Sequence, residues 1–269
     1  MTGSGGQRRV PAGFVSGLEV PLPPIEEQRR IAAILDHAQA LLSRSARRLN
    51  HLDELLDARF RVDFGDLGPK SPGALPLKTF VPQIENGRSP VCESRPRSGA
   101  EYGVLKLGAV TYGTYRPDEN KAYLGEIRST DRPVRAGDLL MTRKNTKDLV
   151  GAVAHVTDTP DRLLLPDLVF RLNYDSDLVH PVFVQRLLMT GSMRDAVRGL
   201  ASGSAASMPN ISKARLLALP VPMPSMKRQE AFVAAAMTVA AVREEAELSQ
   251  RSLGRLTASL QTRAFSGRL

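Results

Sequence analysis

The spacing of apolar residues predicts two long amphipathic helices, one near each end of the chain. From residue 25 the apolar positions advance in alternating steps of four and three, which is the spacing of a coiled-coil seam. In a helix over residues 25–60, this seam is Ile31, Leu35, Ala38, Leu42, Ser45, Leu49, Leu52 and Leu56. In a second helix over residues 226–263, it is Val239, Val242, Ala246, Ser249, Leu253, Leu256 and Leu260. We expect the two helices to pair antiparallel, with a separate domain at one end of the pair.

The residues between these helices show shorter patterns that are typical of a mixed α/β domain. Strand-like alternation occurs in "EYGVLKLGAVTYG" (101–113) and "DLVFRLNYD" (167–175), and residues 136–158 read as strand, polar loop, strand. Residues 180–201 have the period of an amphipathic helix, interrupted at Gly191. A Gly- and Pro-rich linker (64–76) precedes the domain, and a loop of small residues (202–212) follows that helix.

The entry into each long helix is an internal repeat. "VPLPPIEEQRRIAAIL" (20–35) is followed, after a constant offset of 201 residues, by "VPMPSMKRQEAFVAAA" (221–236), and the register holds for almost fifty residues. The prolines impose an extended approach to each helix, because proline is excluded from helix interiors. One glutamine recurs at equivalent places, as Gln28 and Gln229. The repeat predicts two structurally equivalent helix entries.

Composition narrows the classes of protein. The chain has 269 residues, 42% of them hydrophobic, with no apolar run near the roughly 20 residues that a membrane helix needs. The first residues lack the apolar segment of a secretory signal, and the single Cys92 has no partner for an internal disulfide. We therefore expect a cytoplasmic protein. The net charge of +9 fits a polyanionic partner, although many basic chains never touch nucleic acid.

The loop "TRKNTK" is the first candidate for contact with nucleic acid. Its polar side chains suit phosphates and base edges, although a solvated hairpin tip would have the same composition. The candidates on this loop are Arg143, Lys144, Asn145 and Lys147. Weaker candidates are Lys106 and Arg116 near the 101–113 strand, and Ser204, Ser207 and Asn210 on the small-residue loop.

We find no pattern that predicts catalysis or a bound metal. "GSGG" (3–6) is too short for a dinucleotide fingerprint and follows no strand. Asp118 and Glu119 in "PDENK" are adjacent rather than on opposed strands, as a nuclease site would need. The four histidines have no Cys or His partner at metal-ligand spacing.

Taken together in this order, these segments resemble the DNA-specificity subunits of type I restriction-modification systems. The resemblance rests on "LPPIEEQRRIAAILD", "FGD", "YGVLKLGAV", "AGDLLMTRKNTKDLVGAVAHV", "GSAASMPNIS", "LPVPMPSMKRQ" and the terminal "RAFSGRL", and it covers nearly the whole chain. It implies a non-catalytic subunit whose paired helices separate two recognition domains, each reading half of a bipartite DNA target. Methylation subunits, which use S-adenosylmethionine, dock on the helices, and a restriction subunit can join. This chain itself would bind no cofactor.

The sequence departs from that family in having one recognition domain. The resemblance divides it into the remnant of a preceding domain (1–24), a first spacer helix (25–63), a linker (64–76), a recognition domain (77–222) and a second spacer helix (223–269). A homodimer, or pairing with another half-subunit, would restore two domains. Methylation subunits would contact Gln28, Arg29 and Gln229, unless the two glutamines cap their helices.

Three other interpretations remain open. The chain could be a degenerate or regulatory half-subunit that binds methylation subunits without reading DNA. It could be a coiled-coil scaffold that carries a ligand-binding α/β domain. A nuclease or methyltransferase in its own right is the least favoured, since no catalytic pattern supports it.

Overall fold

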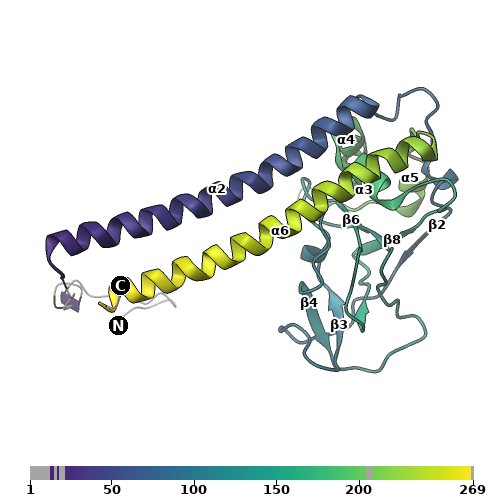
Figure 1. The fold of residues 1–269 in the computed structure, drawn as a ribbon. Helices are drawn as coiled ribbons and strands as arrows, with labels where there is room; N and C mark the ends of the chain where they lie inside the picture. Colours follow the sequence, from purple (N-terminus) through teal and green to yellow (C-terminus); the bar gives the residue numbers. More distant parts are fainter. Residues whose placement is uncertain (1–12, 15–16, 18–21, 204–207, 268–269) are drawn as a thin grey trace. The chain divides into compact units, whose positions relative to one another are not determined.

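The computed structural model describes residues 13–14, 17, 22–203 and 208–267, and it has two compact units. One unit comprises residues 1–54 with 239–269, and the other comprises residues 55–238. Two long helices, α2 (Ile25–Phe64) and α6 (Met226–Phe265), each contribute to both units (Figure 1). They begin at the predicted residues and end a few residues later than predicted. Among the described residues, no helix has the length and hydropathy to cross a membrane.

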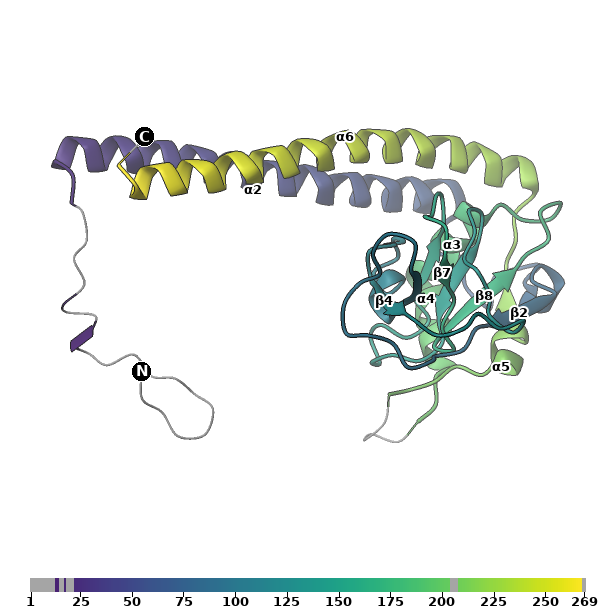
Figure 2. The same cartoon turned by 90° about the horizontal axis from the view of Figure 1, so that it is seen from below.

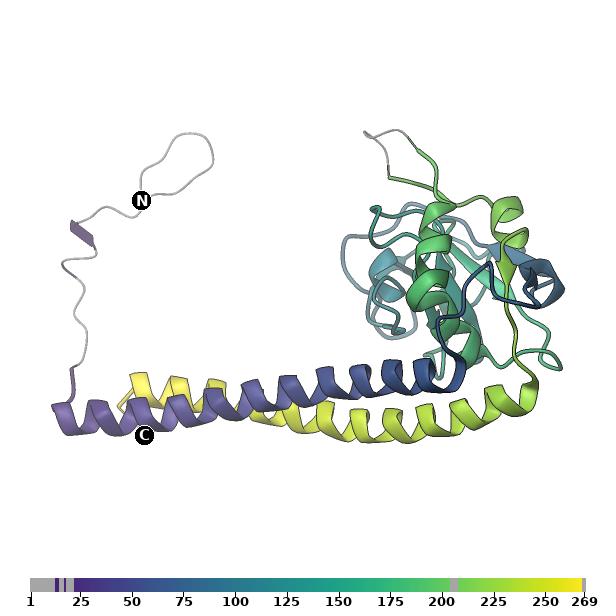
Figure 3. The same ribbon diagram turned by 90° about the horizontal axis from the view of Figure 1, so that it is seen from above.

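In the first unit, α2 and α6 run side by side and antiparallel, as predicted (Figures 2 and 3). Every predicted seam position of α2 from Ile31 to Leu52 is buried or half-buried, with Ala38 the most buried. Arg243 of α6 forms an ion pair with Asp53 of α2 beside the seam. The alternating pattern in the sequence therefore identified the packed face of α2.

The predicted seam of α6 is wrong at two positions. Ser249 is exposed, and Leu256 keeps 55% of its surface exposed. The half-buried Gln250 and the 7% exposed Thr257 lie in the seam instead, because the step after Ala246 is four residues. Thr257 is tolerated there since its hydroxyl donates to the Leu253 carbonyl (2.9 Å). Applying the offset of 201 to the α2 seam yields these same positions, so the repeat is a better guide here than side-chain polarity.

The second unit contains two small sheets. The four-stranded antiparallel sheet has the order β2 (Gln83–Asn86), β8 (Val169–Asn173), β5 (Leu139–Thr142), β6 (Val153–His155). The three-stranded sheet has the order β4 (Asn120–Tyr123), β3 (Tyr102–Leu105), β7 (Leu163–Leu164), with β3 and β7 parallel. A short antiparallel pair, β1 (Leu75–Pro76) with β9 (Pro220–Val221), joins the entry and exit of the domain. The sequence predicted β3, β5, β6 and β8. It did not predict β2 (QIEN) and β4 (NKAY), which are largely polar, or the remaining strands, which have two residues each.

The predicted helix with an interruption at Gly191 is observed as α3 (Pro181–Met189) and α4 (Gly191–Gly199), and α5 (Lys213–Leu217) follows. The break falls at Gly191, whose φ of +51° is left-handed and favours glycine. Asp66, of the "FGD" segment, accepts hydrogen bonds from the backbone N–H and hydroxyl of Ser192 in the first turn of α4. The pKa of the Asp66 carboxyl is lowered by these bonds, the hydroxyl first.

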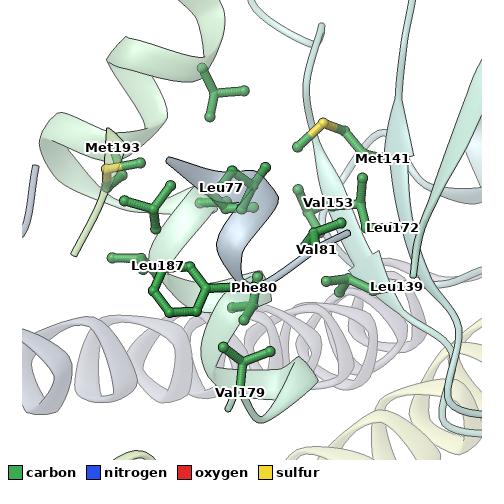
Figure 4. Close-up of a cluster of buried hydrophobic side chains, with 14 of the residues drawn as sticks. Leu77, Phe80, Val81, Leu139, Met141, Val153, Leu172, Val179, Leu187 and Met193 are labelled. Carbon is green, nitrogen blue, oxygen red and sulfur yellow. The ribbon is translucent and has the colours of Figure 1, made fainter. Parts of the chain in front are cut away.

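The core of this unit unites strands, helices α3 and α4, and the adjoining ends of α2 and α6. Leu77, Phe80 and Val81 pack with side chains of the four-stranded sheet and of α3 (Figure 4). Four aromatic rings (Phe60, Phe64, Phe183 and Phe232) form a cluster with centroid separations of 5.1–6.2 Å. These contacts fix the α/β domain on the helix ends that belong to the same unit, and the mixed α/β prediction is confirmed.

Candidate nucleic-acid interface

The loop after β5 is built on a buried threonine. The Thr142 hydroxyl donates to the Leu149 carbonyl and accepts from the Ala152 N–H, both at 2.9 Å, so it closes the loop across its base. Gly151 follows with a φ of +72°, and an added Cβ there would meet Val197 at 2.4 Å. The loop between β5 and β6 therefore leaves the sheet along a defined path.

Two arginines of α4 support this loop from behind. Arg194 donates to the carbonyls of Val150 (2.9 Å) and Asp148 (3.0 Å), and Arg198 pairs with the Asp148 carboxylate. Burial, together with neighbouring Arg198, lowers the pKa of Arg194. Because α4 packs in the core, it holds the loop rigid, as precise recognition requires.

The structure joins the two loops that the sequence singled out separately. Arg143 Nε donates to Asn210 Oδ1 at 3.0 Å, and short backbone bridges link Lys144 with Asn210 and Asn210 with Ser202. A cavity of about 280 Å³ lies between them, lined by Arg143, Lys144, Asp167, Leu168, Ser202, Met208 and Asn210. Ser204 and Ser207, also predicted on this loop, lie outside the described residues.

The arginine at this cavity is oriented by its neighbours. The Arg143 guanidinium lies 5.7 Å from the centroid of Phe170, a buried ring that also has Lys213 Nζ at 5.9 Å. Its Nε is held by Asn210, and its two Nη atoms make no hydrogen bond within the described part of the chain. A bidentate hydrogen-bond donor is thus left available.

Asn145 is buried, whereas its neighbours Lys144 and Thr146 are partly or fully exposed. Its side chain is 7% exposed, Nδ2 donates to Thr111 Oγ1 (3.0 Å), and Oδ1 accepts from the Thr146 N–H (2.9 Å). A buried amide with both ends bonded does not reach a base edge in this conformation. Its side chain instead ties the 143–147 loop to the 111–116 loop.

The other candidates are dispersed around this cluster. Lys147 is exposed, and its carbonyl accepts from Arg198. Lys106 forms an ion pair with Glu119 at 2.8 Å, which compensates its charge. Arg116 stacks 5.0 Å from the ring centroid of the exposed Tyr112, on the loop that Asn145 anchors through Thr111. Lys213, which directly follows the small-residue loop in "NISKAR", is exposed near this cluster but was not among the DNA-contact candidates predicted from the sequence.

The two recurring glutamines make the same hydrogen bond. Gln28 Nε2 donates to the Pro23 carbonyl (2.7 Å), and Gln229 Nε2 donates to the Pro224 carbonyl (2.8 Å). Gln229 is completely buried and also bonds the Leu178 carbonyl and the His180 N–H. This geometry supports the capping role for both residues. Arg29, beside Gln28, is exposed and paired with Glu26 at 2.7 Å.

Comparison with known proteins finds similar chains of one kind. No family model matches the chain. The specificity subunit of the type I restriction enzyme EcoEI of Escherichia coli is 24% identical, over 83% of this chain and 54% of that protein. The EcoKI specificity subunit of E. coli strain K12 is 26% identical, over 96% of this chain and 59% of that protein.

The chain is similar in sequence to type I specificity subunits. It spans little more than half the length of the two relatives it matches. The S subunit of a type I restriction-modification system from M. genitalium shares its fold, with a TM-score of 0.58 and 12% identity over 95% of this chain and 65% of that one. So does a chain from a structural study of type I R-M complex assembly (TM-score 0.53, 19% identity, 93% and 62% covered).

Within this specificity-subunit relative, the described residues hold no group of three or more His, Cys, Asp or Glu side chains arranged to bind a metal. The cavity lined by Arg143 and Asn210 is instead a cationic, hydrogen-bonding surface. Such a surface suits phosphates and base edges.

Proposed function

We propose that this chain is a non-catalytic DNA-specificity component that directs type I methylation subunits to one half of a bipartite DNA target. Its relation to two curated specificity subunits, over 83% and 96% of the chain, carries the proposal. It spans 54% and 59% of those proteins, and we assign one half-site to the mixed α/β unit that it contains. S-adenosylmethionine would be bound by the methylation subunit.

The joined loops would form part of the DNA-reading face. Lys144 and the exposed Lys147 and Lys213 would contact phosphates, which position a protein on the duplex without reading its sequence. Arg143, oriented by Asn210, would present its two Nη atoms, which make no hydrogen bond within the described residues, to O6 and N7 of a guanine, the commonest base-specific contact. The support from α4 would hold these groups in place before DNA binds.

Mapping of methylated adenines, with and without this chain beside its methylation subunits, tests the function. We expect methylation at a defined sequence that appears only when the chain is present. Arg143→Lys, which keeps the charge but loses the bidentate donor, should relax that sequence at one position. Assembly with methylation subunits without sequence-dependent methylation would favour the degenerate or regulatory interpretation.

We further propose that a second recognition domain docks on the first copy of the helix entry, by homodimerisation or by pairing with another half-subunit. At the second copy, Gln229 is buried by the Leu178–His180 segment of the recognition domain. At the first copy, Gln28 makes only its bond to Pro23 among the described residues, and it is half-buried.

Apolar counterparts support the same docking site. Phe64 packs in the aromatic cluster, whereas its repeat counterpart Phe265 is 77% exposed. Met226 is half-buried, whereas its counterpart Ile25 is 58% exposed. An equivalent domain would cover Ile25 and Phe265 as this chain's own domain covers their counterparts.

Sedimentation of the full chain, alone and with methylation subunits, tests this docking. We expect the wild-type chain to form a complex that contains two recognition domains. In the Ile25→Asp or Phe265→Asp variant, we expect the complex to contain only one recognition domain. Leu248→Asp, at an exposed position in the middle of α6, is the matched control and should leave the complex intact. A wild-type complex with one recognition domain at all concentrations contradicts the docking proposal.

A further inference from the structure

Three arginines on the outer face of α2 form a concentrated basic cluster. Arg44, Arg47 and Arg48 are exposed and lie three and four residues apart, so their side chains share one face of the helix. No Asp or Glu stands three or four residues from any of them. Within the described residues, none of the three makes an ion pair or a side-chain hydrogen bond.

Three of the other four arginines of α2 are paired, whereas Arg61 makes no ion pair among the described residues. Arg29, Arg30 and Arg59 each form an ion pair with a carboxylate three or four residues away, at 2.7, 2.7 and 2.6 Å. Like charges at such spacing destabilise a helix by roughly 0.2–0.5 kcal/mol per pair, about as much as opposite charges stabilise it. The cluster therefore opposes helix formation, and helix stability does not explain it.

The internal repeat points the same way. With the offset of 201, the counterparts of Arg44, Arg47 and Arg48 on α6 are Glu245, Leu248 and Ser249. Their helix pairs in the same coiled coil without a basic cluster. The arginines are thus not required by the repeat or by the seam.

The chemistry of this face favours a phosphate polyanion over a protein surface. Protein interfaces centre on buried apolar side chains. From Glu26 to Glu54, α2 exposes no large apolar side chain, and the residues beside the cluster are small or polar. Guanidinium groups bind phosphates with paired hydrogen bonds, and duplex DNA presents phosphates in closely spaced rows.

We propose that Arg44, Arg47 and Arg48 bind phosphates of double-stranded DNA beyond the bases read by the recognition domain. The proposal rests on the proposed DNA-specificity function and extends it to the helix pair. The helix would then be a second, sequence-independent DNA contact as well as a spacer.

Salt titrations of the full chain on two duplexes test this site. One duplex carries the half-site in about 10 bp, a single helical turn, and the other extends it to about 30 bp. On the long duplex, the variant with Arg44, Arg47 and Arg48 all changed to Gln should lower the slope of log K against log salt by about two to three, since each phosphate contact contributes about 0.9. On the short duplex, its affinity should equal that of the wild type.

A control variant removes the same formal charge elsewhere. Changing Arg29, Arg30 and Arg59 to Gln deletes three arginines that are already paired, so we expect a smaller loss on the long duplex. Circular dichroism should show the cluster variant to be as helical as the wild type and no less stable to heat, because repulsion has been removed.

The outcomes separate the two proposals. Equal binding of cognate and scrambled short duplexes by the wild type would overturn the proposed half-site recognition. Cognate preference combined with an unchanged slope in the cluster variant would overturn the phosphate site alone. Loss of methylation-subunit recovery, with DNA binding unchanged, would show that the cluster binds protein and would also overturn it.

Discussion

At the scale of single residues, the loop after β5 contains side chains with opposite roles. Lys144 is partly exposed beside the cavity, whereas Asn145 is buried with both ends of its amide bonded. Neighbours in sequence are thus assigned to DNA contact and to loop structure respectively. Substitution of Lys144 should therefore change DNA affinity, whereas substitution of Asn145 should change the stability of the fold.

Lys144→Ala should weaken binding to cognate and scrambled DNA alike and lower the salt slope by about one, since one phosphate contact is lost. Asn145→Ala should destabilise the fold by about 1–3 kcal/mol, because it removes the hydrogen bonds of the buried amide to the Thr111 hydroxyl and from the Thr146 N–H. Salt titrations and urea unfolding measure the two effects. A cognate-specific loss of affinity in Asn145→Ala, without loss of stability, would restore that residue as a base reader.

A partly buried ion pair makes the stability of the α/β domain sensitive to acid. Arg88 donates from Nε to Asp131 Oδ1 (2.6 Å) and from Nη2 to Oδ2 (3.1 Å). The hydrogen bond from Arg88, followed by that from the Arg128 N–H, lowers the pKa of the Asp131 carboxyl. The stability gained from this carboxylate is therefore present above the ordinary aspartate pKa of about 4 and lost as the pH falls below it.

Asp131→Asn should lower the melting temperature at pH 7, and the difference from the wild type should shrink as the pH falls below about 4. Thermal unfolding at several pH values measures this. Asp118→Asn, which changes an exposed carboxylate with no ion pair in the described structure, is the control. A deficit in Asp131→Asn that stays constant down to pH 3 would show that the ionised carboxylate is not its cause.

At the scale of elements, the helix pair depends on the phase of its seam. Leu42 and Leu49 of α2 lie at seam positions, and in α6 Leu253 lies in the seam while Leu256 faces solvent. A charge at a packed position is buried without a partner, whereas an exposed charge stays solvated. Because both are leucines, side-chain polarity alone does not predict that Leu253 is packed and Leu256 is exposed.

Leu42→Asp, Leu49→Asp and Leu253→Asp should each destabilise the helix pair by several kcal/mol, since each buries an unpaired carboxylate. Leu256→Asp should change stability by about 0.5 kcal/mol or less, as surface substitutions do. Thermal unfolding followed by far-UV circular dichroism, which reports on helix content, compares the four variants. Equal losses at Leu253 and Leu256 would show that the seam has the phase read from polarity.

At the scale of the whole molecule, the net charge of +9 should dominate DNA affinity without setting sequence preference. Phosphate contacts are common to all sequences, whereas base contacts differ between them. Raising salt from about 50 to about 200 mM should weaken binding to scrambled DNA by orders of magnitude. The ratio of cognate to scrambled affinity should change far less. A ratio that collapses with the total affinity would mean that the preference is itself electrostatic.

The sequence alone determined the elements that depend on local chemistry. Proline excludes helix, so the repeated entries marked where α2 and α6 begin, and the apolar period identified the packed face of α2. Alternation over residues 101–113 predicted β3, and the apolar stretches on either side of the polar loop predicted β5 and β6. The resemblance of the ordered motifs to type I specificity subunits also agreed with the relatives found by comparison.

Tertiary structure decided what depends on partners distant in sequence. The α6 seam includes Thr257 and excludes Leu256 because the position of α2 sets the packed face, and a threonine can bond its own helix there. Asn145 is buried because Thr111, 34 residues earlier, accepts its amide. Arg143 meets Asn210 across 67 residues, through backbone bridges that no local pattern encodes. Sequence specified which polar side chains the two loops carry, and packing determined which of them are buried and which are exposed.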